Sequence, residues 1–186
     1  TVRSMAAEVL YDAPDPYSRK IVIDRGATQG VALASPVIND AGVLGQVTRV
    51  YPLSSEVTLL ADKDAAIPVL NARNQLRSAA FGARNGMELR FIAANSDIQE
   101  GDVLATSGVD GVYPAGLPVA RVDRIDRRAD SAFARIHCTP LARVNAARYV
   151  MVLAPVGTPA AALAPASNPA PSSKKSEARK ADRSEE

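Results

Sequence analysis

Short apolar segments rich in Val, Ile and Leu, separated by tight turns, limit how this chain can fold. They recur from about residue 19 to residue 153 at spacings typical of all-β sandwiches and barrels. No apolar stripe of helical period continues over three turns in this region. Asn85-Gly86, a strong signal for a two-residue hairpin, separates two of the segments. The pattern predicts an all-β fold, and closing the sheets into barrels would remove strand edges that favour aggregation.

The stretch from Gly101 to Val122 predicts a strand, an irregular loop and a second strand. Residues 103–105 and 119–122 are typical of strands, while the residues between them include several glycines and prolines, which favour tight turns. The loop also carries apolar side chains beside Pro114, and four of them are the candidate residues: Val109, Val112, Tyr113 and Leu117. Loops run over protein surfaces, so these side chains either tuck under the barrel or form a partner-binding site. Tucking is the expectation and partner binding is the alternative.

A weaker copy of this stretch lies upstream. Gly30 matches Gly101, and Val47 matches Val122 at nearly the same separation along the chain. A nearly constant separation favours one small β unit used twice, and hence two barrels, although common turn chemistry could produce the same match. Eight glycines are assigned to structural turns in the two copies: Gly26, Gly30, Gly42, Gly45, Gly101, Gly108, Gly111 and Gly116.

The same residues resemble the rod shape-determining protein MreC family over about residues 19–154. The motifs that carry the resemblance are Ile21-Val22-Ile23-Asp24-Arg25-Gly26, Gly30-Val31, Gly42-Val43-Leu44-Gly45-Gln46-Val47, Val57-x-Leu59-Leu60-x-Asp62 and the glycine-rich run from Gly101 to Val119. The resemblance implies two six-stranded β-barrels. We expect residues 23–84 to form the first barrel and residues 85–155 the second, with residues 1–22 as a lead-in that could add a strand to the second barrel. A simple sequential split is the alternative.

The resemblance also implies a non-catalytic scaffold of the bacterial cell-elongation machinery, on the periplasmic face of the inner membrane. The implied partners are further copies of the chain, the elongation-specific class B penicillin-binding transpeptidase, and the complex of MreD, RodZ and the actin-like MreB. Family members carry an N-terminal membrane helix and then a coiled coil. This chain starts at Thr1 and has no apolar run approaching the length of about 20 residues that spans a bilayer, so we expect a soluble fragment whose membrane anchor lies elsewhere.

Composition excludes several classes of function. The net charge is only +2, and the arginines between residues 121 and 130 alternate with aspartates, so nucleic-acid binding is not expected. Cys138 is the only cysteine, which rules out an internal disulfide or a Cys-based zinc site and predicts a small buried strand residue. Pro, Ala and Ser dominate after Pro155, so residues 156–186 are expected to be a disordered tail.

A β-barrel hydrolase is the alternative function, with Ser107 as nucleophile, His137 as base and Asp102 as orienting acid. Ser107 lacks the local motif of such nucleophiles, and His137 lies in a predicted strand. Thr106-Ser107-Gly108 resembles the loop of aspartic proteases, but Thr106 stands where the catalytic carboxylate is needed. His137 and Cys138 point to opposite faces of a strand and cannot share a metal ion. We therefore expect no catalytic, cofactor or metal site, and a generic envelope binding module remains a further alternative.

Overall fold

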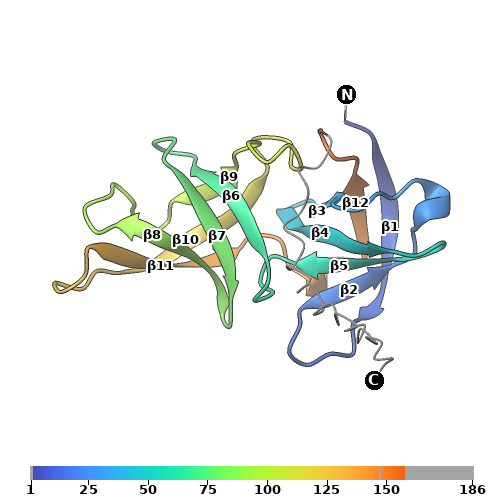
Figure 1. Ribbon diagram of the computed structural model, residues 1–186, viewed down its shortest axis with the longest axis horizontal. Coiled ribbons are helices and arrows are strands. Elements are labelled where there is room, and N and C mark those ends of the chain that lie inside the picture. The colour runs from blue at the N-terminus through green and yellow to red at the C-terminus, as the bar shows by residue number, and fades with distance from the viewer. Residues whose placement is uncertain (1, 147, 158–186) are drawn as a thin grey trace, which may run out of the picture.

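The computed structural model describes residues 2–146 and 148–157, and Figure 1 shows two closed β-barrels side by side. The predicted all-β fold of two six-stranded barrels is confirmed. The predicted tail lies outside the described residues, apart from Val156 and Gly157. The strands are β1 (Ser4–Asp12), β2 (Lys20–Ile23), β3 (Pro36–Asn39), β4 (Gly42–Val50), β5 (Ser55–Leu59), β6 (Ala66–Asn71), β7 (Arg77–Ala83), β8 (Gly86–Ala93), β9 (Val103–Thr106), β10 (Pro118–Asp126), β11 (Phe133–Pro140) and β12 (Tyr149–Leu153).

Two short 3₁₀ helices, η1 (Ala27–Gln29) and η2 (Val144–Ala146), interrupt the loops. In the described part of the chain, no helix approaches the length and apolar character needed to cross a bilayer.

The barrels are not divided along the chain as predicted. The first has the closed order β1-β12-β3-β4-β5-β2, and the second has the closed order β10-β11-β8-β7-β6-β9. Thus β6 and β7, expected in the first barrel, belong to the second, while β12 belongs to the first. The N-terminal strand β1 also joins the first barrel and not the second. The predicted boundaries at residues 22 and 84 are therefore wrong, and so is the prediction that residues 149–153 belong to the second barrel.

One pattern of strand neighbours is used in both barrels. The neighbours β1·β2, β2·β5, β5·β4 and β4·β3 correspond to β7·β8, β8·β11, β11·β10 and β10·β9. The sixth position has a different origin: β12 lies between β1 and β3, whereas β6 lies between β7 and β9. Each half of the chain, β1 to β6 and β7 to β12, therefore supplies five strands to its own barrel and its last strand to the other.

The register of the ladders agrees with this correspondence. Val47 pairs with Val57 just before a bulge, and Val122 pairs with Cys138 just before an equivalent bulge, as the match of Val47 with Val122 requires. The N–H of Val47 donates to the carbonyl of Ser35, and the N–H of Val122 donates to the carbonyl of Asp102. The upstream counterpart of Asp102 is thus Ser35.

The predicted alignment of the two copies, which placed Gly30 on Gly101, is therefore wrong. Ala34 takes the place of Gly101, and both have a positive φ, 67° and 90°. The left-handed region favours glycine, so sequence matching aligned the two glycines and passed over the alanine.

Asp62 holds the link through which the chain crosses from β5 to β6. Its buried carboxylate accepts hydrogen bonds from the backbone N–H of Arg19 at 2.6 Å and of Asp64 at 2.9 Å. Gly82 of β7 lies against the same link, where a Cβ atom would stand 1.6 Å from the Asp62 carbonyl oxygen. The N–H of Gly82 donates to the carbonyl of Ala65 at 3.0 Å. Close backbone contact therefore fixes the direction in which the chain enters the second barrel.

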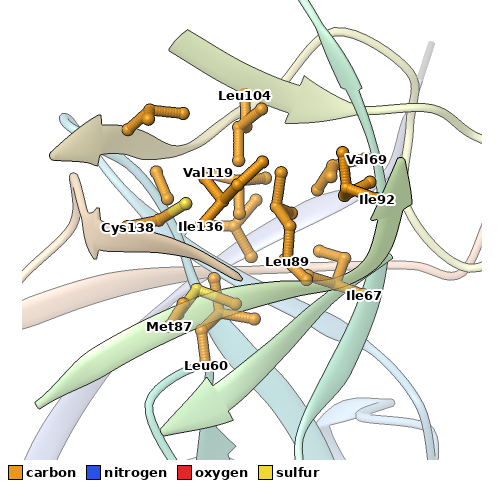
Figure 2. Packing of buried hydrophobic residues seen from close by; sticks show 14 of the residues in the cluster. Leu60, Ile67, Val69, Met87, Leu89, Ile92, Leu104, Val119, Ile136 and Cys138 are labelled. Carbon is orange, nitrogen blue, oxygen red and sulfur yellow. The ribbon is translucent and has the colours of Figure 1, made fainter. Parts of the chain in front are cut away.

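Apolar packing continues from one barrel into the other. The core of the second barrel includes Ala34, Val43 and Leu60, which come from the first half of the chain. Figure 2 shows Leu60 beside Met87 at the edge of this cluster. The first barrel has a separate core of small and branched side chains around Ile21. Shared packing and exchanged strands join the barrels.

We predict that a chain ending at residue 148, which lacks β12, loses the first barrel. The side chains of Val150, Val152 and Leu153 are buried, and burial of each contributes about 1.5 to 3 kcal/mol. Their combined loss is comparable with the whole stability of a typical domain, about 5 to 15 kcal/mol. Urea unfolding with amide hydrogen exchange measures the effect, and a chain ending at residue 157 is the control. Equal protection of β1 in the two chains would contradict the prediction.

Candidate functional site

The loop between β9 and β10, residues 107–117, lies partly inside the second barrel. Tyr113 is only 4% exposed, and Val112 is also buried in the second-barrel core. Leu117 is half-buried against this core, whereas Val109 is 61% exposed. Burial raises the pKa of the Tyr113 hydroxyl well above its usual range. Three of the four candidate residues thus turn inward, and Val109 alone of the four presents its side chain to solvent.

Thr106 closes this loop at its base. Its hydroxyl donates to the carbonyl of Pro114 at 2.5 Å and accepts from the N–H of Leu117 at 2.9 Å. The carboxylate of Asp110 accepts from the N–H groups of Val112 and Tyr113 at 3.1 and 3.3 Å. Thr106 therefore serves as a clamp for the loop.

The eight glycines assigned to turns serve two structural purposes. Six of them have a positive φ that favours glycine: Gly30, Gly42, Gly101, Gly108, Gly111 and Gly116. Gly26 and Gly45 are needed for space, since a Cβ at Gly45 would lie 2.0 Å from the carbonyl oxygen of Thr58 in the neighbouring strand. Gly45 lies inside β4 and pairs with strands on both sides, so its assignment to a turn is wrong.

A buried polar network surrounds Asp102 and ties β6 to the start of β9. Its carboxylate accepts from Asn71 at 2.6 Å, from the backbone of Gln99 at 3.0 Å, and from the Nε and Nη2 atoms of Arg73 at 2.9 and 3.0 Å. Arg73 also pairs with Asp97 at 2.9 Å. The hydrogen bond from Arg73 lowers the pKa of Asp102 to about 2. Asn71 is the last residue of β6, so the network fixes the exchanged strand in the second barrel.

The residues considered for hydrolysis have separate partners. The Ser107 hydroxyl donates to the carbonyl of Pro68 at 3.4 Å, and His137 Nε2 lies 3.0 Å from Asp126 Oδ2. Asp102 is occupied by Arg73, so the three residues are not arranged as a nucleophile, base and orienting acid. Cys138 is buried as predicted, and burial raises the pKa of its thiol to about 12.

The described residues bring together no group of three His, Cys, Asp or Glu side chains that could hold a metal ion.

Sequence analysis missed a surface on the second barrel that carries exposed aromatic rings. Phe91 of β8 is 79% exposed and Phe133 of β11 is 54% exposed, and their rings lie edge to face with centroids 6.3 Å apart. Beside them, the guanidinium carbon of Arg90 lies 4.8 Å from the ring centre of Phe81. The two adjacent apolar residues Phe91-Ile92 break an otherwise alternating strand, and this break was the available signal for a bulge. We call Phe81, Arg90, Phe91 and Phe133 the aromatic face.

Substituting Tyr113 with alanine should lower the free energy of unfolding by about 3 kcal/mol, because the change leaves a cavity in the second-barrel core. Val109→Ala, in the same loop but exposed, should change it by less than about 0.5 kcal/mol. Thermal or urea unfolding of the two variants tests the buried arrangement. A Tyr113→Ala chain as stable as the Val109→Ala chain would show that the loop does not support the core.

Asp102 should make stability depend on acid pH. Its pKa is lower in the folded chain than its ordinary value of 3.8, so its contribution is present above pH 4 and is lost as the pH falls through about 2. That contribution is about 2 kcal/mol. Urea unfolding from pH 6 to pH 2 should give a steep fall for the native chain and a shallower one for Asp102→Asn. Asp130→Asn, an exposed carboxylate change, is the control, and parallel curves for native and Asp102→Asn would contradict the assignment.

The chain matches the model of a known family and a curated protein. The family model described as rod shape-determining protein MreC, barrel core, matches residues 9–154. The cell shape-determining protein MreC of Escherichia coli strain K12 is 39% identical over 153 residues, which are 81% of this chain and 42% of that protein. The chain thus spans less than half the length of this relative.

Two solved structures share the fold. The crystal structure of MreC from Pseudomonas aeruginosa matches with a TM-score of 0.77 and 38% identity, over 81% of this chain and 98% of that one. MreC in a complex with a penicillin-binding protein (PBP2) from Helicobacter pylori matches with a TM-score of 0.65 over 82% of this chain and 98% of that one; at 16% identity this is a likeness of fold. From the match over residues 9–154 and the identity to the curated relative, the chain belongs to the rod shape-determining protein MreC family.

Proposed function

We propose that this chain is the folded, non-catalytic scaffold region of a bacterial protein that maintains rod shape. The observation that carries the proposal is the family match over residues 9–154, together with the curated relative named as cell shape-determining. The separate partners of Ser107, His137 and Asp102 favour a role without turnover. The β-barrel hydrolase is therefore not favoured.

The barrels suit the binding of proteins through side chains. Both sheets are closed, so they offer no free strand edge for pairing with an extended peptide. A partner must then be recognised by exposed side chains and loops. Exchange of β6 and β12 holds the barrels together, so that surfaces on both can be presented in a fixed relation.

The proposed setting is the periplasmic face of the inner membrane. There the chain positions cell-wall synthesis proteins, self-associates, and connects through a membrane anchor outside these residues to MreD, RodZ and the MreB filament. The elongation-specific class B penicillin-binding transpeptidase is the proposed direct partner. The complex of PBP2 with MreC from Helicobacter pylori, a protein of the same fold, supports this choice.

Capture from detergent-solubilised envelope tests the proposal, with the purified chain as bait. The transpeptidase, detected by its covalent reaction with a fluorescent penicillin, should be enriched on the native chain. A bait ending at residue 148, without β12, is the control because its first barrel cannot close. Recovery of no penicillin-binding protein would contradict the proposed partnership, whereas equal recovery on both baits would place the contact on the second barrel, which keeps all its strands.

A further inference from the structure

The three phenylalanines of the chain all lie outside its two buried cores. Phe81, Phe91 and Phe133 come from three neighbouring strands of the second barrel, β7, β8 and β11. Aromatic rings contribute most to stability when they are buried, yet two of these rings are more than half exposed. Aromatic residues and arginine are the residues enriched at protein interfaces, and the aromatic face consists of them alone.

Backbone geometry turns Phe91 outward. Ala134 pairs with Ile92 and Ile136 pairs with Leu89, so Arg90 and Phe91 together face the single residue between Ala134 and Ile136. Phe91 has a φ of 60°, a left-handed conformation that glycine adopts without strain and a bulky residue does not. The side chain gains little burial in return, since it stays 79% exposed and meets the ring of Phe133 edge to face. Neither local conformation nor core packing explains a phenylalanine here, whereas contact with another molecule does.

Charges of both signs border the face. A groove of about 400 Å³ beside Phe91 and Phe133 is lined by three cations, Arg90, Arg128 and Arg135, and three anions, Glu88, Asp126 and Asp130. Arg90 pairs with Glu88 at 2.6 Å, and Asp126 contacts Arg124 and His137, both at 3.0 Å.

Arg128, Arg135 and Asp130 are exposed and form no ion pair within the described residues. Arg135 stays unpaired although Asp126 lies opposite it in the ladder. A partner of one charge sign would bring repulsion as well as attraction to this surface. In a second copy related by two-fold symmetry, each cation can meet an anion, because the groove carries cations and anions in equal number.

We propose that the aromatic face binds the same face of a second copy of this chain. Resting on the proposed scaffold function, this assigns a surface to self-association. Phe91 and Phe133 of the two copies pack together, and Asp130 of each copy faces Arg135 of the other. The aromatic face consists of four side chains, far fewer than the roughly 20 to 30 residues per partner of a standard interface, so we expect the contact to be weak when copies are free in solution. It becomes effective where copies are held close together.

Sedimentation equilibrium of the full chain at up to millimolar concentration tests the aromatic contact. The native chain should show reversible dimerisation, and Phe91→Gly and Phe133→Ala should each weaken it at least tenfold. Phe91→Gly should keep or raise the unfolding midpoint, since glycine accepts the positive φ. Tyr17→Ala, which removes an 83% exposed ring outside this face, should leave dimerisation unchanged. A monomeric native chain, or dimerisation unaffected by Phe91→Gly, overturns the proposal.

Charge reversal tests the two-fold arrangement. Asp130→Arg and Arg135→Asp should each weaken dimerisation, because each places like charges opposite one another in both halves of the contact. Mixing the two variants should restore association as a heterodimer, since opposite charges then meet at both places. A mixture that associates no better than either variant alone overturns the assigned pairing of the two faces.

Transpeptidase capture separates this proposal from the proposed function. If Phe91→Gly abolishes capture but leaves dimerisation intact, the face binds the transpeptidase, and self-association through it is excluded. If the native chain dimerises through the face but captures no transpeptidase, the self-association proposal stands and the proposed partnership fails.

Discussion

The exchange of β6 and β12 joins the two barrels into one structure. Each barrel is closed by a strand that the other half of the chain supplies, so neither half can close a sheet from its own six strands. The network around Asp102 fixes the end of β6, and buried valines fix β12. Each interaction that stabilises an exchanged strand in its barrel therefore also holds the two barrels together. The apolar contacts of Leu60 and Val43 with the second-barrel core add to this connection.

Closure of both sheets also decides where binding surfaces arise. Every strand has a neighbour on each side, so exposed backbone is scarce and recognition depends on side chains. The β8 bulge provides such a surface by directing Phe91 away from the core, while the β9–β10 loop, rich in apolar residues, directs Tyr113 into it. The two segments show that an apolar residue outside a regular strand can take either direction, and that the local backbone determines which.

Sequence patterns were sufficient for the fold class and for much of the loop that carries Tyr113. Glycine spacing and apolar runs indicated closed all-β units, and the match of Val47 with Val122 agrees with the ladders. The strand exchange was not predictable because β6 and β12 look like ordinary strands, and periodicity describes a strand without naming its neighbours. The match of Ala34 with Gly101 was missed because nothing in the sequence indicates that an alanine adopts a left-handed φ. The aromatic face was missed because the break in the alternation of apolar and polar residues at Phe91-Ile92 does not indicate which of the two side chains points outward.

Strand exchange has a consequence for how the chain folds as it is synthesised. Strands β6 to β11 are consecutive, so the second barrel can close once Pro140 has emerged. The first barrel must wait for β12, whose pairing joins Ser4 to Leu153, nearly the two ends of the described chain. Such long-range closure is slow, and until it occurs β1 and β3 are open edges able to pair with other chains. When β12, the last strand of the described residues, pairs with β1 and β3, it covers both of these open edges.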